Sequence, residues 1–269
     1  MKGAAKRRSS EAPALSDEEQ DERLSSLKVE MIAILERAFK NRWFRREKLT
    51  MISPQMAKDL TASNTPQRQA IVDFFRALAV CHTVLPDLPD DSERTGGEKR
   101  LDYKAESPDE AALVAGARDA GFPFLARSST AVDIEVMGQA ERYVPLKLLE
   151  FNSTRKRMSV IVRDPQGRLV LYCKGADSVI YERLASGQDD IKERTREDME
   201  VFANGGLRTL CIAYRFLSEE EYLTWSVKYD AAAAATTDRD EAIDKANELV
   251  EHNLLILGAT ALEDKLQEV

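Results

Sequence analysis

The chain has 269 residues, of which 39 are basic and 47 acidic, and its formal net charge is −8. Hydrophobic residues make up 43% and charged residues 32%, a globular composition that excludes disorder throughout and a fibrous repeat. The longest nearly uninterrupted apolar run, residues 254–262, is far shorter than the roughly 20 residues that cross a bilayer. The acidic pI of about 5.1 disfavours nucleic acid as a general partner.

Cysteine and histidine are few and far apart in the sequence. Cys81, Cys173 and Cys211 form no C-x-x-C pair, and His82 and His252 stand near no second cluster of metal ligands. We therefore expect reduced thiols in the core of a cytosolic protein, and no metal site. The basic first eight residues are followed by no apolar stretch, so we expect no secretory signal.

The N-terminal third is predicted to be helical after a polar start. Residues 1–26 contain almost nothing to bury, which predicts a disordered tail, and we assign 27–269 to one domain. From Leu27 to Phe39 apolar residues recur at spacings of three and four, which predicts an amphipathic helix. A second helix is predicted over 66–81, and a polar loop over 85–102.

Residues Ser107, Pro108 and Glu110 form the pattern of a helix start. Serine is a preferred N-cap, proline fits the first helical position, and a glutamate three residues after the cap closes a capping box. The predicted helix ends at Gly121. In this interpretation the role of Glu110 is structural.

Beyond Gly121 the hydrophobic period changes toward two, which predicts strands. The turn Asp164–Gly167 separates two apolar runs and predicts a β-hairpin. The predicted strands are 132–136, 144–151, 158–162, 169–173, 210–216 and 254–259, and the predicted helices are 178–184, 191–203, 218–225 and 238–252. Hairpin-linked strands with helices around them predict an α+β fold with a largely antiparallel sheet flanked by helices.

Local charge is the main chemical signal, because the common phosphate-binding and serine-nucleophile motifs are absent from the sequence. Six basic residues and one acid lie between Phe151 and Gly175. An aromatic ring beside convergent cations suits a nucleotide, whose base stacks on the ring while lysine or arginine binds the phosphates. The alternative is a solvated pair of basic strands that binds nothing.

Six sequence blocks, in a fixed order, resemble signatures of the type IV P-type ATPases, the phospholipid flippases. The blocks are 74–84 (FFRALAVCHTV), 103–114 (YKAESPDEAALV), 151–161 (FNSTRKRMSVI), 174–180 (KGADSVI), 206–210 (GLRTL) and 258–267 (GATALEDKLQ). The region before Phe74 resembles the fungal branch loosely, through Leu49–Pro54. The resemblance implies the nucleotide-binding domain of such a pump, with the fold of that domain and with 260–269 at the start of the hinge to a phosphorylation domain.

The resemblance also implies roles for single residues. Phe151 is expected to stack on adenine, and Lys174 to lie deep in the cleft, where the small Gly175 lets the ligand approach the backbone. Arg208 is expected to reach the phosphates. Glu110 is expected to contact the adenine amino group, a role that competes with the capping box.

Three further residues, Ser153, Lys156 and Thr209, complete the predicted ATP-binding set. The implied ligand is ATP, with Mg²⁺ held mostly by another domain. The family's phosphorylated aspartate belongs to an Asp-Lys-Thr-Gly motif that this sequence lacks. We therefore expect the isolated chain to bind ATP without catalytic residues of its own, and so to be inactive.

The implied partners are the phosphorylation and actuator domains of the intact pump, while an accessory subunit and the lipid contact only other regions. The isolated chain is expected to be a soluble monomer, and the pump to place it at the cytosolic face of a membrane. An alternative function is a regulatory module of the same pump, in which the domain, or its tail 1–26 and acidic helices, docks regulatory segments or partner proteins. The basic and acidic tail and the polar loop 85–102 motivate this alternative.

Overall fold

A computed structural model describes residues 16–87 and 100–263. Parts of the predicted tail (1–15), polar loop (88–99) and hinge (264–269) lie outside the described residues. The helices are α1 (Asp17–Ala38), the short 3₁₀ helix η1 (Arg46–Lys48), α2 (Pro54–Thr61), α3 (Pro66–Val80), α4 (Pro108–Asp119), α5 (Asp177–Tyr181), α6 (Asp189–Asn204), α7 (Glu219–Ala233) and α8 (Arg239–Glu248). The strands are β1 (Leu85–Asp87), β2 (Asp102–Lys104), β3 (Phe124–Arg127), β4 (Val132–Val136), β5 (Gln139–Leu149), β6 (Arg157–Arg163), β7 (Leu169–Gly175), β8 (Arg208–Leu217) and β9 (Leu255–Leu262).

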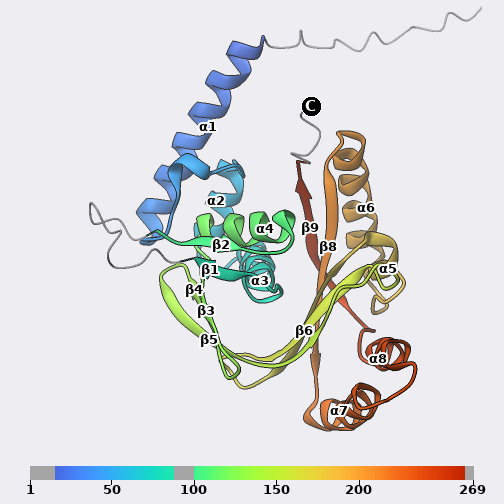
Figure 1. The fold of residues 1–269 in the computed structure, drawn as a ribbon. Coiled ribbons are helices and arrows are strands. Elements are labelled where there is room, and N and C mark those ends of the chain that lie inside the picture. Colours follow the sequence, from blue (N-terminus) through green and yellow to red (C-terminus); the bar gives the residue numbers. More distant parts are fainter. Residues whose placement is uncertain (1–15, 88–99, 264–269) are drawn as a thin grey trace, which may run out of the picture.

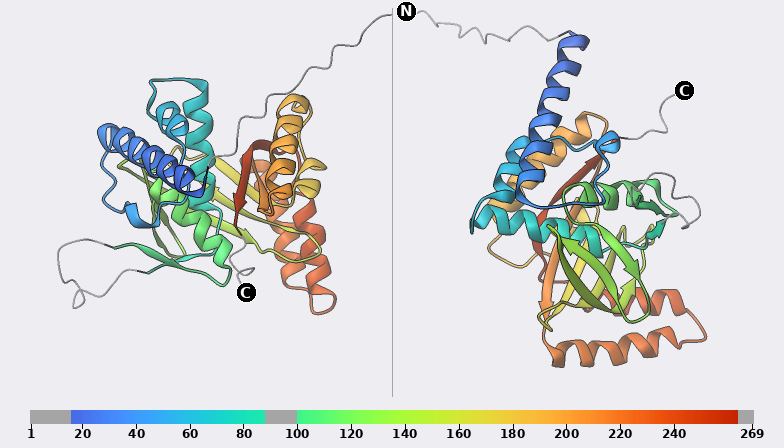
Figure 2. Two further views of the ribbon diagram at one scale, coloured as in Figure 1. Left: turned by 90° about the horizontal axis from the view of Figure 1, so that it is seen from above. Right: turned by 90° about the vertical axis from the view of Figure 1, so that its left-hand side faces the viewer.

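Strands β3 to β9 form a seven-stranded sheet in which the chain order is also the spatial order. Every neighbouring pair is antiparallel. The sheet is strongly curled, with α1–α4 on one side and α5–α8 on the other (Figure 1), and the views in Figure 2 show the same division. The predicted α+β class with an antiparallel sheet is confirmed.

The central strands β6, β7 and β8 alternate their side chains between two hydrophobic cores. We call the face toward α1–α4 the inner face and the face toward α5–α8 the outer face. Inner-face core residues are Met158, Val160, Val162, Val170, Tyr172 and Ile212, and outer-face core residues are Ile161, Leu169, Leu171, Cys173, Cys211 and Ala213. Because both faces are covered, these strands have nearly continuous apolar sequences.

Local N-cap residues determine where the first two helices begin. Helix α1 begins at Asp17 rather than Leu27, so the segment predicted to be a disordered tail is helical over 17–26. Its start is a capping box, in which Ser16 accepts from the Glu19 backbone N–H and the Glu19 side chain accepts from Ser16. Helix α2 was not predicted, although Ser53 caps it with Pro54 at its first position.

Most other predicted elements are present with shifted ends. Helix α3 matches its predicted range, and the β6–β7 hairpin forms around Gly167, whose φ of 82° suits glycine. Helix α7 continues well beyond Trp225, to Ala233. Strand β3 and the short β1–β2 pair were missed.

Within the described part of the chain, no helix combines the length and the apolarity needed to cross a bilayer.

The three cysteines are buried free thiols, as predicted. Burial raises the pKa of Cys81 to about 11 and that of Cys211 to about 12. Both therefore remain protonated at neutral pH and act as small core residues.

The tightest backbone approach in the sheet predicts a matched pair of glycine variants. A methyl group at Gly175 would lie 2.5 Å from Cβ of Arg157 and 2.6 Å from the carbonyl oxygen of Lys156, whereas one at Gly116 in α4 would meet nothing within 4 Å. We expect Gly175→Ala to lower the free energy of unfolding by about 1–3 kcal/mol. We expect Gly116→Ala to raise it by about 0.4–1 kcal/mol. Urea denaturation checks both, and an unchanged Gly175→Ala midpoint would contradict the packing.

Candidate functional site

Four segments that carry predicted site residues meet at one end of the sheet. There β5 ends, β6 begins, β7 ends and β8 begins, and the register aligns Arg157 with Gly175 and Gly175 with Cys211. The first turn of α4 lies against this end, because Glu110 there contacts Lys174 on β7. The structure thus brings together side chains from α4, β7, β8 and the β5–β6 loop (residues 150–156).

A buried ion pair lies on the inner face at this end. The Nζ atom of Lys174 donates to Oε1 of Glu110 at 2.7 Å, and the two side chains are only 8% and 11% exposed. Thr83, just after α3, donates its hydroxyl to Oε2 of Glu110 at 2.7 Å. Burial raises the pKa of the Glu110 carboxyl, but the charge and hydrogen bonds of Lys174 and Thr83 outweigh it and leave that pKa below its ordinary value.

The capping-box prediction for α4 is wrong. The helix begins at Pro108 as expected, but the Ser107 side chain makes no capping hydrogen bond. The Glu110 carboxylate turns instead toward Lys174, because a buried ammonium is a stronger partner than a backbone N–H near solvent. Thr83 was missed as a site residue, although it lies in the first of the six sequence blocks.

The β5–β6 loop presents three predicted site residues to solvent. Phe151 is 62% exposed, so its ring is not part of the hydrophobic core. Ser153 and Lys156 in the same loop are also exposed. The backbone of Lys156 has a φ of 53°, and its N–H donates to the Asn152 carbonyl at 2.8 Å, so the loop is a defined turn.

The start of β8 contributes Arg208 but not Thr209 to this face. An Nη1 atom of Arg208 lies 3.2 Å from Oδ2 of Asp109, on the first turn of α4. Successive side chains of a strand point to opposite faces, so the side chain of Thr209 points away from that of Arg208. It therefore lies on the outer face, as Cys211 does. The structure does not bring the Thr209 side chain to Lys174.

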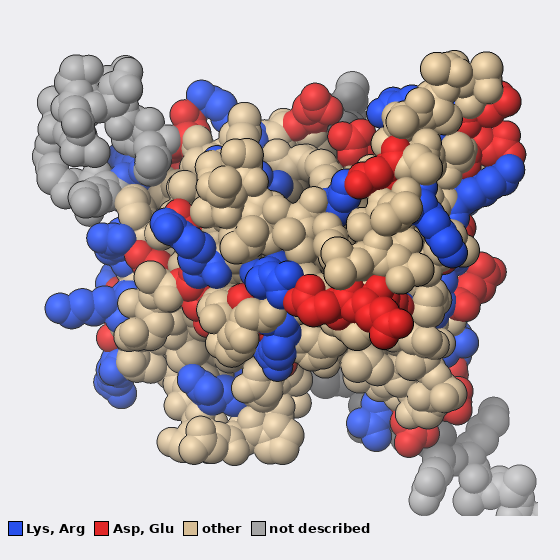
Figure 3. All heavy atoms as spheres, turned by 90° about the horizontal axis from the view of Figure 1, so that it is seen from below, with Lys and Arg blue, Asp and Glu red and all other residues tan. Residues whose placement is uncertain are grey.

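The local excess of basic residues is mostly compensated by ion pairs, all but one of them with acids from distant segments. The pairs are Arg155–Glu251, Arg157–Glu251, Arg157–Glu248, Arg163–Glu219, Arg168–Asp164 and Lys174–Glu110. Among the described residues, Lys156 is the member of the basic set without an ion pair. Figure 3 shows basic and acidic side chains interspersed over one face of the molecule. Arg155 and Arg157 are buried, so the description of solvated basic strands does not hold for these two residues.

A hollow of about 290 Å³ lies farther along the inner face, lined by Val80, Arg127, Leu148, Val160 and their neighbours. It contains none of the predicted site residues. Val160, which lines the hollow, pairs with Tyr172 and is the next inner-face position after the Met158–Lys174 pair. Gly175, by contrast, gives room to the neighbouring strand rather than to a ligand, because a side chain there would meet Arg157.

Metal chemistry has no ready donor set in the described residues, where no three His, Cys, Asp or Glu side chains form a cluster that could hold an ion. His82 is fully buried, and its ring nitrogens contact backbone groups. Its Nδ1 atom accepts from the Val84 N–H at 3.1 Å, and Nε2 lies 2.9 Å from the Ala79 carbonyl oxygen. Burial lowers its pKa well below the ordinary value, so the ring stays neutral.

The fold is a curled antiparallel sheet with helices on both faces, and its family follows from similarity to known proteins. Residues 70–269 match the family model described as P-type ATPase, cytoplasmic domain N. The chain therefore belongs to the P-type ATPases, as the cytoplasmic nucleotide-binding domain N. This confirms the family predicted from the six sequence blocks.

Similar curated proteins are named phospholipid-transporting ATPases. The phospholipid-transporting ATPase DNF1 of Chaetomium thermophilum is 46% identical over 249 residues, which cover 92% of this chain and 16% of that protein. The phospholipid-transporting ATPase IC of Xenopus tropicalis is 50% identical over 198 residues, covering 74% and 15%. The phospholipid-transporting ATPase dnf2 of Schizosaccharomyces pombe is 43% identical over 270 residues, covering 100% and 19%. The chain thus spans less than a fifth of these relatives.

The buried pair predicts a pH-dependent difference in stability. The lowered pKa of Glu110 means that its ionised form stabilises the fold above the ordinary carboxyl pKa of about 4.3, and this contribution is lost as the pH falls through the folded-state value. We expect Glu110→Gln to lower the free energy of unfolding at pH 7 by about 1–3 kcal/mol. The gap to the unmodified protein should narrow below about pH 4.

Glu106→Gln is the control, because Glu106 is exposed just before α4. Urea denaturation of the three proteins between pH 3 and pH 8 measures both differences. A constant gap between Glu110→Gln and the unmodified protein across this range would contradict the ionised pair.

Proposed function

We propose that this chain is the ATP-binding domain of a phospholipid flippase. In the intact pump it holds Mg·ATP so that the γ-phosphate meets an aspartate on a neighbouring domain. The observation that carries the proposal is the solvent-exposed ring of Phe151 at the end of the sheet that also contains the buried Lys174–Glu110 pair. Family membership and the names of the relatives support it.

The adenine end of the ligand uses the ring and the ion pair. Stacking of a base on Phe151 contributes about 1–3 kcal/mol. The Glu110 carboxylate accepts a hydrogen bond from the adenine amino group, and Lys174 lies against the base and ribose. Because Thr83 already fixes one carboxylate oxygen, Glu110 is oriented before the nucleotide arrives.

The phosphate end uses the exposed cations at the same end of the sheet. Arg208 is half exposed, and its forked guanidinium suits phosphate oxygens. Lys156 supplies a second positive charge, and Ser153 a hydroxyl, from the β5–β6 loop. The triphosphate is only partly enclosed, so we expect weak binding to the isolated chain.

The reaction itself belongs to the assembled pump. This domain positions the nucleotide, and the neighbouring phosphorylation domain supplies the aspartate that attacks the γ-phosphorus in line with the departing ADP oxygen. Closure between domains sets that geometry at the cytosolic face of the membrane. Alone, the chain is expected to bind ATP without turnover and to remain monomeric.

The alternative of a docking module has less support. It is motivated by the tail 1–26 and the loop 85–102, and residues 1–15 and 88–99 of these lie outside the described part of the chain. The described remainder of the tail is the start of α1, and that of the loop includes β1 and the first residue of β2. ATP binding is therefore the function that we propose.

An ATP titration followed by amide NMR tests the proposal. We expect saturable shifts around Phe151 and Lys174, and Phe151→Ala should weaken binding by roughly tenfold because it removes the stacking surface. Phe202→Ala is the control, since Phe202 is also exposed, at 40%, but lies on α6 over the outer face. Its affinity should match that of the unmodified domain.

Two outcomes would count against the proposal at different levels. Absence of saturable shifts at tens of millimolar ATP would contradict the function. Unchanged affinity in both Phe151→Ala and Lys174→Met, with the fold confirmed by circular dichroism, would leave ATP binding intact and refute the position of the pocket.

A further inference from the structure

The β5–β6 loop has one side that faces solvent and one side that packs against the protein. Phe151, Ser153 and Lys156 face solvent, whereas Asn152 and Arg155 face the protein. The Asn152 carboxamide oxygen accepts from the Arg155 backbone N–H at 2.7 Å, which closes a local turn. The positions of the exposed residues therefore depend on the contacts that hold the side chains of Asn152 and Arg155.

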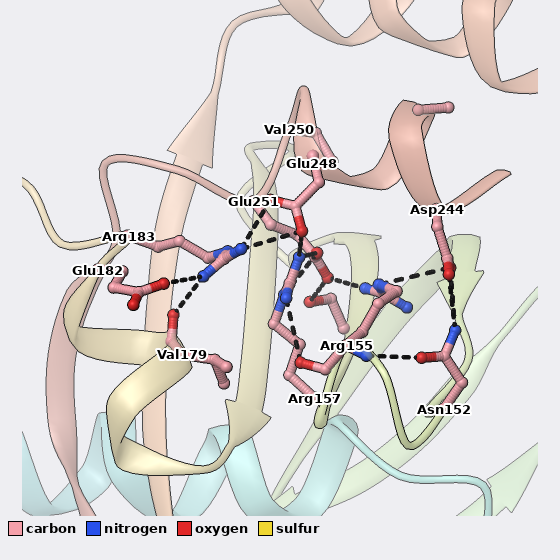
Figure 4. A network of polar contacts seen from close by, with 12 residues as sticks. Asn152, Arg155, Arg157, Val179, Glu182, Arg183, Asp244, Glu248, Val250 and Glu251 are labelled. Carbon is pink, nitrogen blue, oxygen red and sulfur yellow. Dashed lines mark hydrogen bonds and ion pairs between the residues drawn. The ribbon is translucent and has the colours of Figure 1, made fainter. Parts of the chain in front are cut away.

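Glu251, after α8, is the centre of that fixation (Figure 4). Its carboxylate is fully buried and accepts from Arg155, from Nε of Arg157 at 2.7 Å and from the Ser159 hydroxyl at 2.6 Å. Arg155 in turn donates to the Glu150 carbonyl at 2.7 Å, at the start of the loop. One carboxylate thus ties the loop to the first residues of strand β6.

A second attachment lies nearer the surface. The Asn152 amide nitrogen donates to both carboxylate oxygens of Asp244 on α8, at 2.9 and 3.1 Å. Figure 4 shows Asp244 and Asn152 facing each other at the edge of the network. Both attachments come from residues 244–251, so this one segment fixes both ends of the turn that carries Ser153.

We infer that Glu251, assisted by Asp244, is a positioning residue for nucleotide binding, which it serves through the β5–β6 loop without touching the ligand. The inference rests on the proposed function. Removing the Glu251 carboxylate leaves the buried Arg155 guanidinium with only the Asp244 carboxylate, 3.9 Å away, as a charge partner, while Arg157 keeps Glu248. The loop is then free to move Phe151 away from Lys174. Affinity falls because the stacking ring is no longer placed before the base arrives.

The first test uses the surface attachment, where the fold is least at risk. Asp244→Ala is expected to weaken ATP binding by about three- to tenfold, with little change in melting temperature. Asp240→Ala, one turn earlier on α8 and exposed, is the matched control and should bind as the unmodified protein does. Hydrogen exchange at the Arg155 and Lys156 amides should rise only in Asp244→Ala.

The second test separates positioning from stability. Glu251→Gln is expected to lower both the melting temperature and the ATP affinity. In Glu251→Gln/Arg155→Met the poorly compensated Arg155 charge is gone and Arg157 keeps Glu248, so the melting temperature should recover in large part. The affinity should stay about tenfold weak, because the loop still lacks its attachment. Recovery of affinity together with stability would overturn the inference.

Phe151→Ala, measured in parallel, distinguishes the two levels of failure. If the unmodified chain does not bind ATP, the proposed function fails. If it binds and Phe151→Ala weakens binding, while Asp244→Ala and Glu251→Gln/Arg155→Met bind as the unmodified protein does, the function stands and the positioning role is wrong.

Discussion

Strict alternation of side chains along β6, β7 and β8 determines where the polar groups of the candidate site lie. Both faces of these strands are covered, so each position belongs either to the inner core or to the outer core. Lys174 falls on the inner face, toward α4, while Arg157 and Ser159 fall on the outer face, toward Glu251. A slip of one residue would reverse every assignment, so the hydrophobic pattern of the strands also fixes the site.

Two buried ionic systems consequently flank the β5–β6 loop from opposite faces of the same strands. Lys174 and Glu110 join β7 to α4 on the inner face, and Glu251 with its two arginines joins β6 to the segment after α8 on the outer face. Buried charges are costly to desolvate and tolerate few geometries, so each system specifies one arrangement of the elements it joins. Between them lies the most exposed aromatic ring of the candidate site, that of Phe151.

Periodicity and turn chemistry predicted the fold class, the β6–β7 hairpin and helix α3, because those signals are local. The pairing of charges was not predictable in the same way. The partners of Lys174 and Arg155 lie 64 and 96 residues away in sequence, so a count of neighbouring charges gave a basic patch where the folded chain has mostly neutralised pairs. The same long-range contact explains why Glu110 does not close the capping box.

Other misses had a signal in the sequence. Ser16 and Glu19 form a capping box that places the start of α1, and Ser53–Pro54 marks the start of α2. The short strand β3 had a weaker signal in the sequence. It is a strand because it pairs with β4, and its own hydrophobic pattern does not indicate one. The site residues taken from the family resemblance converge at one end of the sheet, apart from Thr209, whose parity on β8 places it on the other face.

The position of the purine is the central point, and a crystal structure of the domain with a non-hydrolysable ATP analogue tests it most directly. The account predicts the base stacked against the Phe151 ring, its amino group facing the Glu110 carboxylate, and the β5–β6 loop in the turn described above. Nucleotide density at another surface, with that ring left in solvent, would contradict it.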